Sequence, residues 1–581
     1  MTDIWHGSHS PSRFWRGGLW ALELRDDELA DLTYDGRRVL RSVRAVVRDR
    51  DWNTAGWVVE QVAETDTSLE LLLHTEGHGA ELRATVRVDV ADDLLVVSFD
   101  AVSTTDFETN RTGLVVLHPP QVAGADLAVT SSDGAARASA FPRDISPHQP
   151  AFDIAGLAWT DDGLDIDVRF TGDVFEMEDQ RNWTDASFKT YSRPLALPFP
   201  YALPAGSGVR QSIAVRVAPR AAAAEGPDRD LLELTDTGSA FPALVVGAST
   251  APDPAPAAVP IGRTLLVELD LAAPNRRAAL ARAAASGLPL DVRIVLDSAD
   301  QDDPADPAAL GELVAALVGL PVVRIGAFAP DTHVTDDAVA AALRAALADA
   351  GLELPVVGGA RSHFTELNRE RSRIPDDLDG IVFSVTPLFH SLTSEQLVES
   401  VAMQRLVAQQ AVTLAGDALV HIGPVTLRPR FNDVATVRPP LPRDTDLAHG
   451  YGAQHADADD DRQDAPQLAA WTIASAAALA VPGVASIAYF EEWGPRGAVS
   501  AAGADRPVAA ALRALAALAG ARLLSATSPD GLVWAVGGDS AHARTVLVAN
   551  LDTRVRDLTV TVDGVVHAAS VPAEGWIALK A

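Results

Sequence analysis

The chain contains no cysteine, which excludes disulfide bonds, thiolate metal sites and cysteine nucleophiles. It also lacks any apolar run approaching 18 residues without charge or proline, so no segment is expected to span a membrane. The first residues show no basic stretch followed by an apolar one, the pattern of a secretory signal. We therefore expect a cytoplasmic protein.

Positive charge is scarce in this sequence. It has 79 acidic and 47 basic residues, which give a formal net charge of −32 and a pI near 4.7. Such acidity disfavours binding to nucleic acid or to an anionic membrane surface. We expect the partner to be a small molecule, and the sequence leaves a homo-oligomer open.

Lysine is almost absent, because Lys189 and Lys580 are the two in the chain and the other 45 basic residues are arginine. Lys189 lies in segment 173–193, where eight of 21 residues are charged and aromatic residues stand between them. Charge mixed with aromatic rings is typical of sites that hold polar, sugar-like ligands. The alternative is a solvated hairpin whose aromatic side chains pack over the edge of the hydrophobic core. The segment predicts four substrate-binding residues: Asp179, Arg181, Trp183 and Lys189.

The length of 581 residues is too great for a single core and predicts two to four domains. Residues 1–220 contain short alternating runs, such as LELLLHTE and LDIDVRFTG, without a helical period. This pattern predicts an N-terminal β-sandwich domain. Residues 221–261 are rich in proline and alanine, and we expect a linker with one short strand, FPALVVGAS.

Residues 262–528 alternate apolar runs with Ala- and Arg-rich helical stretches, the signature of βαβ units. Eight strand candidates in about 270 residues match the count and size of a (β/α)8 TIM barrel. The candidates are TLLVELDL, DVRIVLDS, PVVRIGAFA, LPVVGGA, GIVFSVTPL, ALVHIGPVTL, VASIAYFEE and ARLLSATS. A doubly wound sheet is the alternative, but no Gly-rich phosphate turn follows the first strand. Residues 529–581 return to strand-like runs and predict a small C-terminal β domain.

Function in a TIM barrel resides at the carboxyl ends of the strands. In the count above, Glu366 follows the fourth strand and Glu491 ends the seventh, as paired carboxylates do in a large clan of retaining glycosidases. One member of such a pair donates protons and the other stays ionised, so we predict that both glutamates are catalytic. The alternative is that Glu366 caps a helix and Glu491 or Glu492 lies at a solvated rim. Further residues at strand ends are expected to bind substrate: His363, Asn368, His390, Arg428, Arg430, Glu492 and Trp493.

No motif for a metal or a cofactor is evident. The histidines lack HExxH spacing, and the acidic run 457–464 lacks the glycine and the terminal glutamate of a calcium loop. We expect neither a metal nor a cofactor. The absence of GxSxG also argues against a serine hydrolase of the α/β-hydrolase type.

Seven strings carry a family resemblance: RVLRSVRAVVRDRDWNT, NRTGLVVLHP, FPRDISPHQPAFD, FEMEDQRNWTDASFKTYSRPL, HFTELNR, PVTLRPRFN and YFEEWGPRG. Together they resemble the D-apionate lactonase family over residues 38–497. The resemblance implies an N-terminal β domain, a TIM barrel and a C-terminal β domain, and hydrolysis of the lactone of D-apionate to the free acid. In the family a small polar residue follows the glutamate of the last string, where this chain has Glu492, so Glu491 is favoured.

The barrel and the resemblance lead to one chemical hypothesis. A sugar lactone is planar at its carbonyl carbon, like the oxocarbenium-like transition state of glycoside cleavage, so a glycosidase-like pocket suits it. We expect Glu491 to activate water and protonated Glu366 to supply the departing ring oxygen with a proton. A retaining glycoside hydrolase that uses the same glutamates is the alternative, and a non-catalytic carbohydrate-binding protein is a third. Donors expected at the carbonyl oxygen are His363, Asn368, His390 and Arg428.

Overall fold

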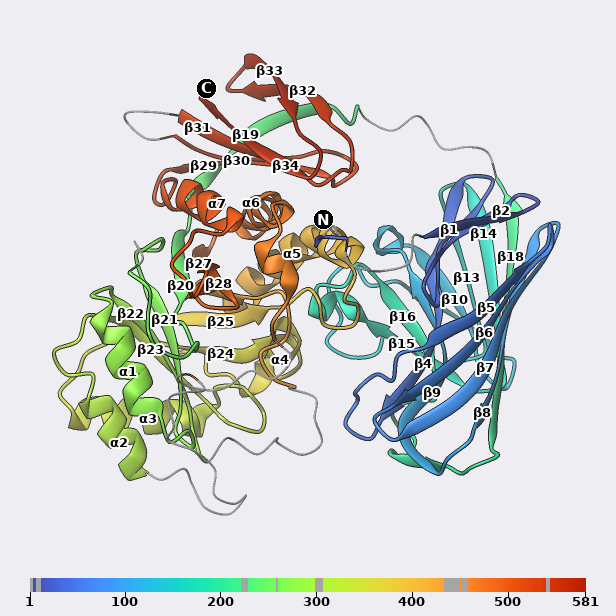
Figure 1. Ribbon diagram of the computed structural model, residues 1–581, viewed down its shortest axis with the longest axis horizontal. Helices are drawn as coiled ribbons and strands as arrows, with labels where there is room; N and C mark the ends of the chain where they lie inside the picture. Colours follow the sequence, from blue (N-terminus) through green and yellow to red (C-terminus); the bar gives the residue numbers. More distant parts are fainter. Residues whose placement is uncertain are drawn as a thin grey trace.

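The computed structural model has three parts, and Figure 1 shows the N-terminal β domain (blue to cyan) beside a barrel. The C-terminal sheet (red) lies on another side of the barrel, above helices α6 (Gln467–Leu479) and α7 (Pro507–Ala516). The structure describes residues 4–6, 12–220, 228–257, 260–297, 307–432, 450, 458–539 and 544–580. None of the helices in these ranges is long and apolar enough to cross a membrane.

Two nine-stranded sheets enclose one apolar core in the N-terminal domain, which confirms the predicted sandwich. The first sheet runs β1-β2-β3-β4-β9-β16-β15-β12, with β17 paired to β9. Its strands are β1 (Arg13–Gly17), β2 (Trp20–Arg25), β3 (Glu28–Tyr34), β4 (Arg37–Asp49), β9 (Phe107–His118), β12 (Ala151–Ile154), β15 (Phe175–Asp179), β16 (Phe188–Ser192) and β17 (Tyr201–Leu203).

The second sheet runs β11-β10-β13-β14-β18-β8-β7-β6-β5. In β6 every second residue from Leu69 to Thr75 is buried, because successive side chains of a strand point to opposite faces. Its strands are β5 (Val58–Glu64), β6 (Ser68–Gly77), β7 (Ala80–Ala91), β8 (Leu94–Ser103), β10 (Asp126–Thr130), β11 (Ala136–Ala140), β13 (Gly156–Asp161), β14 (Leu164–Thr171) and β18 (Gly208–Pro219).

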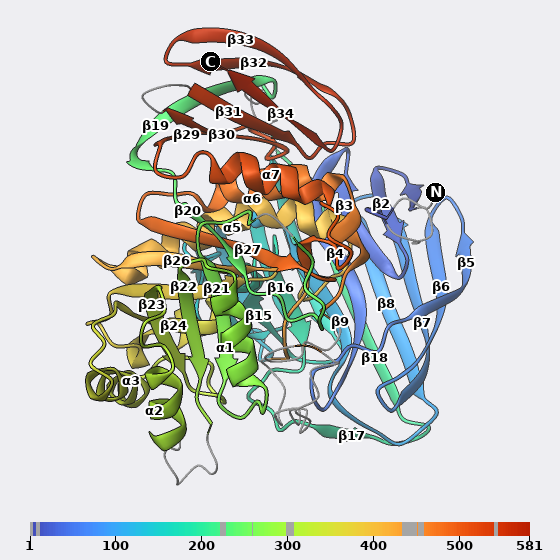
Figure 2. The ribbon, with the colours of Figure 1, turned by 60° about the vertical axis from the view of Figure 1, so that its left-hand side comes forward.

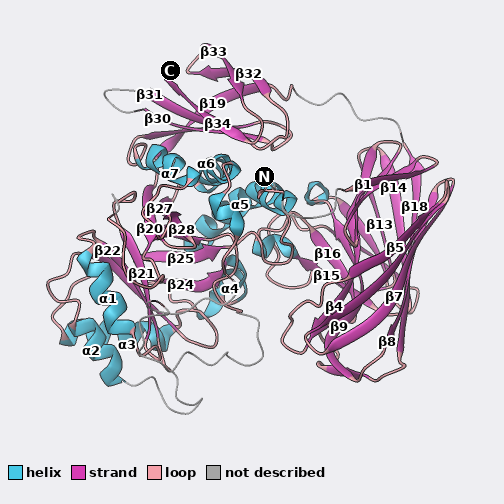
Figure 3. Ribbon diagram, in the orientation of Figure 1, coloured by secondary structure: helices cyan, strands magenta, loops and turns pink. Residues whose placement is uncertain are grey.

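Eight parallel strands close into a barrel through pairing of β20 with β27, and this confirms the predicted TIM barrel. Figure 3 shows that most helices of the molecule gather around these strands. The strands are β20 (Ala243–Gly247), β21 (Leu265–Asp270), β22 (Leu290–Val295), β23 (Val322–Phe328), β24 (Val356–His363), β25 (Gly380–Val385), β26 (Leu419–Val425) and β27 (Val484–Trp493), with β28 (Gly497–Val499) paired to β27. The other helices are α1 (Arg276–Ala285), α2 (Pro307–Ala315), α3 (Asp337–Asp349), α4 (Phe364–Arg369) and α5 (Ser394–Ala415).

The strand count made from the sequence needs one correction. The short run in the expected linker forms β20, the first barrel strand, whereas ARLLSATS forms a strand of the C-terminal sheet. Five apolar residues beside a Pro- and Ala-rich stretch carry little periodicity, so only their burial in the closed barrel identifies them. Glu366 therefore follows the fifth barrel strand and Glu491 lies on the eighth, rather than the fourth and seventh.

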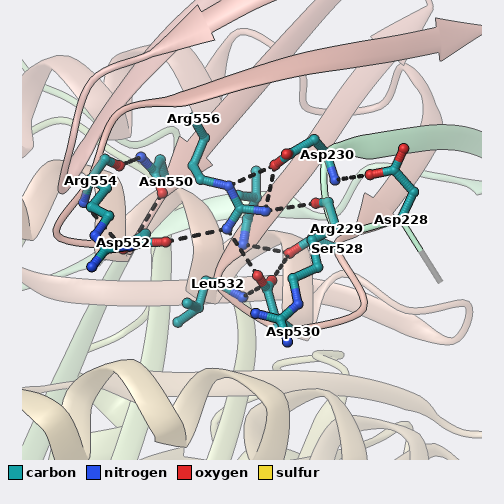
Figure 4. Close-up of polar contacts among 12 residues, drawn as sticks. Asp228, Arg229, Asp230, Ser528, Asp530, Leu532, Asn550, Asp552, Arg554 and Arg556 are labelled. Atoms are coloured by element: carbon teal, nitrogen blue, oxygen red, sulfur yellow. Dashed lines mark hydrogen bonds and ion pairs between the residues drawn. The ribbon is translucent and has the colours of Figure 1, made fainter. Parts of the chain in front are cut away.

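The C-terminal sheet has the order β33-β32-β19-β29-β30-β31-β34, and its β19 comes from the expected linker. Figure 4 shows Arg556 joining this segment to the sheet through Asp230 (2.8 Å), Asp530 (2.9 Å) and Asp552 (3.3 Å). The strands are β19 (Leu231–Ala240), β29 (Arg522–Thr527), β30 (Val533–Asp539), β31 (Arg544–Asn550), β32 (Arg556–Val562), β33 (Val565–Val571) and β34 (Gly575–Lys580).

The N-terminal domain contacts the barrel through the hairpin β15–β16 and the short 310 helix η2 (Gln180–Trp183) within it. Thr365 of α4 donates to the carbonyl of Asn182 at 3.1 Å. Asn368 donates to the side chain of Asn182 at 2.9 Å and to the carbonyl of Ile145 at 3.1 Å. Since α4 directly follows β24, the hairpin reaches the carboxyl-terminal side of the barrel.

Candidate active site

A cavity opens at the carboxyl ends of β20, β21, β26 and β27, where a TIM barrel carries its chemistry. We call it the barrel cavity. Its polar lining consists of Ser249, Thr250, Glu268, Thr426, Arg430, Asp460, Gln463, Glu491 and Arg496. Of the two glutamates predicted to be catalytic, Glu491 lines this cavity.

Glu491 is buried and held by three hydrogen bonds. Thr250 donates its backbone N–H at 3.0 Å and its hydroxyl at 2.8 Å, and Arg496 Nε donates at 3.0 Å. Arg496 also forms an ion pair with this carboxylate. Close approach of the first and last barrel strands sets this geometry, since a Cβ on Gly247 would lie 2.7 Å from the carbonyl oxygen of Phe490.

Glu268 is a cavity residue that the sequence reasoning missed. Arg361 donates to one of its oxygens at 2.8 Å and Arg430 to the other at 2.8 Å. Burial opposes ionisation, but the two guanidinium groups outweigh it and hold the pKa of the Glu268 carboxyl well below its usual range. A charged residue within the apolar run TLLVELDL was the available signal, although nothing in the sequence indicated its partners.

Glu366 does not line the barrel cavity. It is the third residue of α4, and its carboxylate accepts from the Ser362 hydroxyl at 2.6 Å and from the His363 N–H at 3.1 Å. This is the helix-capping arrangement that the sequence left as the alternative. His363, the residue before the helix, lies edge-on to Phe389 with 4.9 Å between ring centroids.

Glu492 and Trp493, the two predicted residues that follow Glu491, do not line the barrel cavity. Glu492 is half-buried, and burial raises the pKa of its carboxyl. Trp493 is buried, and the guanidinium of Arg282 lies 4.3 Å from its ring centroid. Neither residue lines the cavity, so their predicted contact with substrate finds no support there.

The two predicted arginines after β26 take different positions. Arg430 lines the barrel cavity and also donates to the carbonyl of Arg361 at 2.8 Å. Arg428 pairs with Asp460 at 3.1 Å, and Arg462 pairs with the same carboxylate. Burial opposes ionisation of Asp460, but these arginines lower the pKa of its carboxyl overall.

Three of the four residues predicted from segment 173–193 hold the fold together. Arg181 and Asp179 form a fully buried ion pair at 2.6 Å, and Arg181 also donates to the carbonyls of residues 142, 143 and 144. Trp183 stacks on Phe389 with a centroid distance of 6.0 Å. None of these three residues lines the barrel cavity.

Lys189 and His390 line a second cavity, between the first N-terminal sheet and the barrel loop after β25. We call it the interdomain cavity. Lys189 pairs with Glu178 at 2.6 Å, and His390 Nδ1 lies 2.9 Å from Asp185 Oδ2. Sequence reasoning selected both residues but gave no indication that they share a cavity apart from Glu491.

The family is decided by comparison with known proteins. Family models for the N-terminal domain and the TIM barrel domain of D-apionate lactonase match residues 2–220 and 249–520. The chain belongs to the D-apionate lactonase family. This confirms the resemblance and the prediction of a hydrolase. The chain is 29% identical over 550 residues to D-apionate lactonase from Brucella anthropi, and the match covers 87% of each protein.

Solved structures give weaker similarity to this family member. SrfJ from Salmonella typhimurium is 11% identical with a TM-score of 0.38, covering 63% of this chain and 95% of its own. A GH36 α-galactosidase from Geobacillus stearothermophilus is 9% identical with a TM-score of 0.27, covering 98% and 99%.

Proposed function

We propose that this enzyme hydrolyses a sugar lactone, D-apionolactone to D-apionate, in the barrel cavity. One observation carries the choice of site: Glu491, a buried carboxylate at the end of a barrel strand, lines that cavity. The relative from Brucella anthropi that carries the lactonase name supports the choice of substrate.

Glu491 acts as the general base in this proposal. It takes a proton from a water molecule, whose oxygen attacks the lactone carbonyl carbon. The tetrahedral intermediate collapses, the bond from the carbonyl carbon to the ring oxygen breaks, and the proton passes from Glu491 to the departing oxygen. One carboxylate thus serves both steps, so no second acid at position 366 is required.

Arginine side chains supply the positive charge that the intermediate needs. Arg430 and Arg496 line the barrel cavity, and both are held in place by carboxylates, Glu268 and Glu491 respectively. Fixed cationic donors stabilise the negative charge that develops on a carbonyl oxygen during attack. They are therefore the proposed oxyanion donors.

The lowered pKa values of two carboxyl groups in the barrel cavity favour a lactone over a glycoside as substrate. A glycosidase needs a carboxylic acid with a raised pKa to protonate the leaving oxygen. Glu268 and Asp460 line the same cavity, but the pKa of each is lowered, so neither holds a proton near neutral pH. Neither Glu268 nor Asp460 can therefore be the proton donor that a glycoside hydrolase needs.

A substrate panel tests the proposal. Sugar lactones and aryl glycosides are incubated with the enzyme, with and without a chelator, and acid release is followed with a pH indicator. We expect acid release from lactones, fastest with apionolactone, and no cleavage of glycosides. Cleavage of glycosides alone would contradict the proposal.

A further inference from the structure

The interdomain cavity is lined by many positively charged side chains, although the protein as a whole is strongly acidic. Five cationic side chains and two carboxylates are among its lining residues. The cations are Arg41, Arg44, Arg48, Arg111 and Lys189. None of the residues that line this cavity also lines the barrel cavity.

Three of these cations have carboxylate partners. Arg41 pairs with Glu28 at 3.3 Å and with Glu399 at 2.6 Å. Arg44 pairs with Asp27 at 3.3 Å, and Lys189 pairs with Glu178 at 2.6 Å. Their charges are therefore largely neutralised within the protein.

Arg111 is different, because it is buried with part of its guanidinium unused. It is 6% exposed, and its Nε and Nη2 have no hydrogen-bond partner among the described residues. The guanidinium lies 3.6 Å from the ring centroid of Tyr191 and 5.2 Å from that of Trp52, which fixes its plane. A buried donor without an acceptor is costly, so this group is arranged for a ligand.

Arg48 adds a second charge without a carboxylate in ion-pair contact in the described part of the chain. Its Nη1 donates to the carbonyl of Trp52 at 2.9 Å. Burial, together with the like charges of Arg111 and Arg44, lowers the pKa of Arg48 to about 10. Two neighbouring guanidinium groups that repel each other would both be stabilised by one bound anion.

Three further lining residues, Asp185, His390 and Gln396, can recognise hydroxyl groups. Asp185 accepts from His390 at 2.9 Å and from Gln396 Nε2 at 3.1 Å. Burial lowers the pKa of His390, so the ring is neutral near pH 7. With Nδ1–H directed to Asp185, Nε2 is left as an acceptor for a ligand hydroxyl.

We propose that the interdomain cavity is a binding site for a small polyhydroxy carboxylate. The carboxylate lies on the guanidinium groups of Arg111 and Arg48, and the hydroxyls bind His390 and Asp185. Bidentate pairing with arginine suits a carboxylate, and the neutral histidine with its aspartate suits a sugar-like chain. This site is separate from the proposed lactonase centre, so a sugar acid can bind there without occupying Glu491.

Isothermal titration calorimetry on the full chain in a phosphate-free buffer tests the proposal. D-Ribonate is the probe, with ribitol for the hydroxyls alone and inorganic phosphate for the charge alone. Wild type and Glu491→Gln are expected to bind ribonate equally, because the site does not include the barrel cavity. Ribitol and phosphate are expected to bind at least tenfold more weakly.

Two arginine variants and one control complete the test. Arg111→Gln and Arg48→Gln are each expected to weaken ribonate binding at least tenfold, while circular dichroism shows retained structure. Arg210→Gln, at an exposed arginine of the same domain, is expected to bind within twofold of wild type. Undiminished binding by both arginine variants, loss in Glu491→Gln, or equal affinity for phosphate would overturn the proposal.

Discussion

Thr250 donates both its backbone N–H and its side-chain hydroxyl to the carboxylate of Glu491, at 3.0 and 2.8 Å. The two residues are 241 positions apart, and they meet because β20 and β27 close the barrel. The contact fixes the rotamer of the proposed base before substrate arrives, which is how preorganised sites gain rate.

The role of Glu491 predicts a large kinetic effect of its removal. Glu491→Gln keeps the size of the side chain but cannot accept a proton, so kcat for lactone hydrolysis should fall by roughly 10²–10⁴-fold. Initial rates with a pH indicator measure this change. Glu366→Gln is the matched control, and we expect it to keep most of its activity because its carboxylate caps α4. A larger loss of kcat in Glu366→Gln than in Glu491→Gln would contradict this assignment and support the prediction from the sequence that Glu366 is catalytic.

Thr250 is predicted to act as a positioning residue. Thr250→Val removes the hydroxyl but retains the backbone donor, and kcat should fall about tenfold with little change in KM. Thr250→Ser should restore the rate, because it restores the hydroxyl. A steady-state kcat and KM comparison of the three proteins measures the effect. Equal losses in the Ser and Val variants would argue for a packing role instead.

Glu366 should contribute to stability rather than to turnover. Glu366→Ala removes the acceptor for the His363 N–H and the Ser362 hydroxyl, and the loss of such a cap costs about 1 kcal/mol. Urea unfolding monitored by circular dichroism measures the free energy of unfolding. Glu370→Ala, at the end of the same helix, is the control and should stay close to wild type.

Arg556 should stabilise the C-terminal sheet. Arg556→Gln leaves Asp230, Asp530 and Asp552 without their shared cation, and we expect a loss of about 2 kcal/mol. Thermal unfolding measures the change. Arg210→Gln removes an 81% exposed partner of Asp100 and should change stability by less than about 0.5 kcal/mol. An unchanged melting temperature in Arg556→Gln would show that β19 is held without this cluster.

A buried carboxylate within the barrel predicts a pH dependence of stability. Burial opposes ionisation of Asp291, but Arg293 and Arg324 lower the pKa of its carboxyl from 3.8 to about 2. Its folded pKa is below its unfolded pKa, so its contribution is complete above about pH 4 and is lost as the pH falls towards 2. Unfolding at pH 5 and pH 3 should show a smaller difference for Asp291→Asn than for wild type. An identical pH dependence would contradict this assignment.

The sequence by itself determined the fold class, because alternation in the N-terminal strands and the βαβ rhythm from residue 262 are local patterns. It also indicated that Glu491 ends a barrel strand. It could not identify β20, since five apolar residues have too little periodicity to separate a barrel strand from a linker. That omission displaced the strand count and with it the analogy that selected Glu366.

Only the tertiary structure decided which side chains share a cavity. Glu268 accepts hydrogen bonds from Arg361 and Arg430, and the three residues lie on three different strands or loops. Lys189 of the N-terminal domain lines the same cavity as His390 of the barrel domain. Spacing along the chain gives the direction of a side chain within its own element. The distance between elements depends on how the barrel closes and how the β domain packs against it. Local sequence patterns predict neither of these.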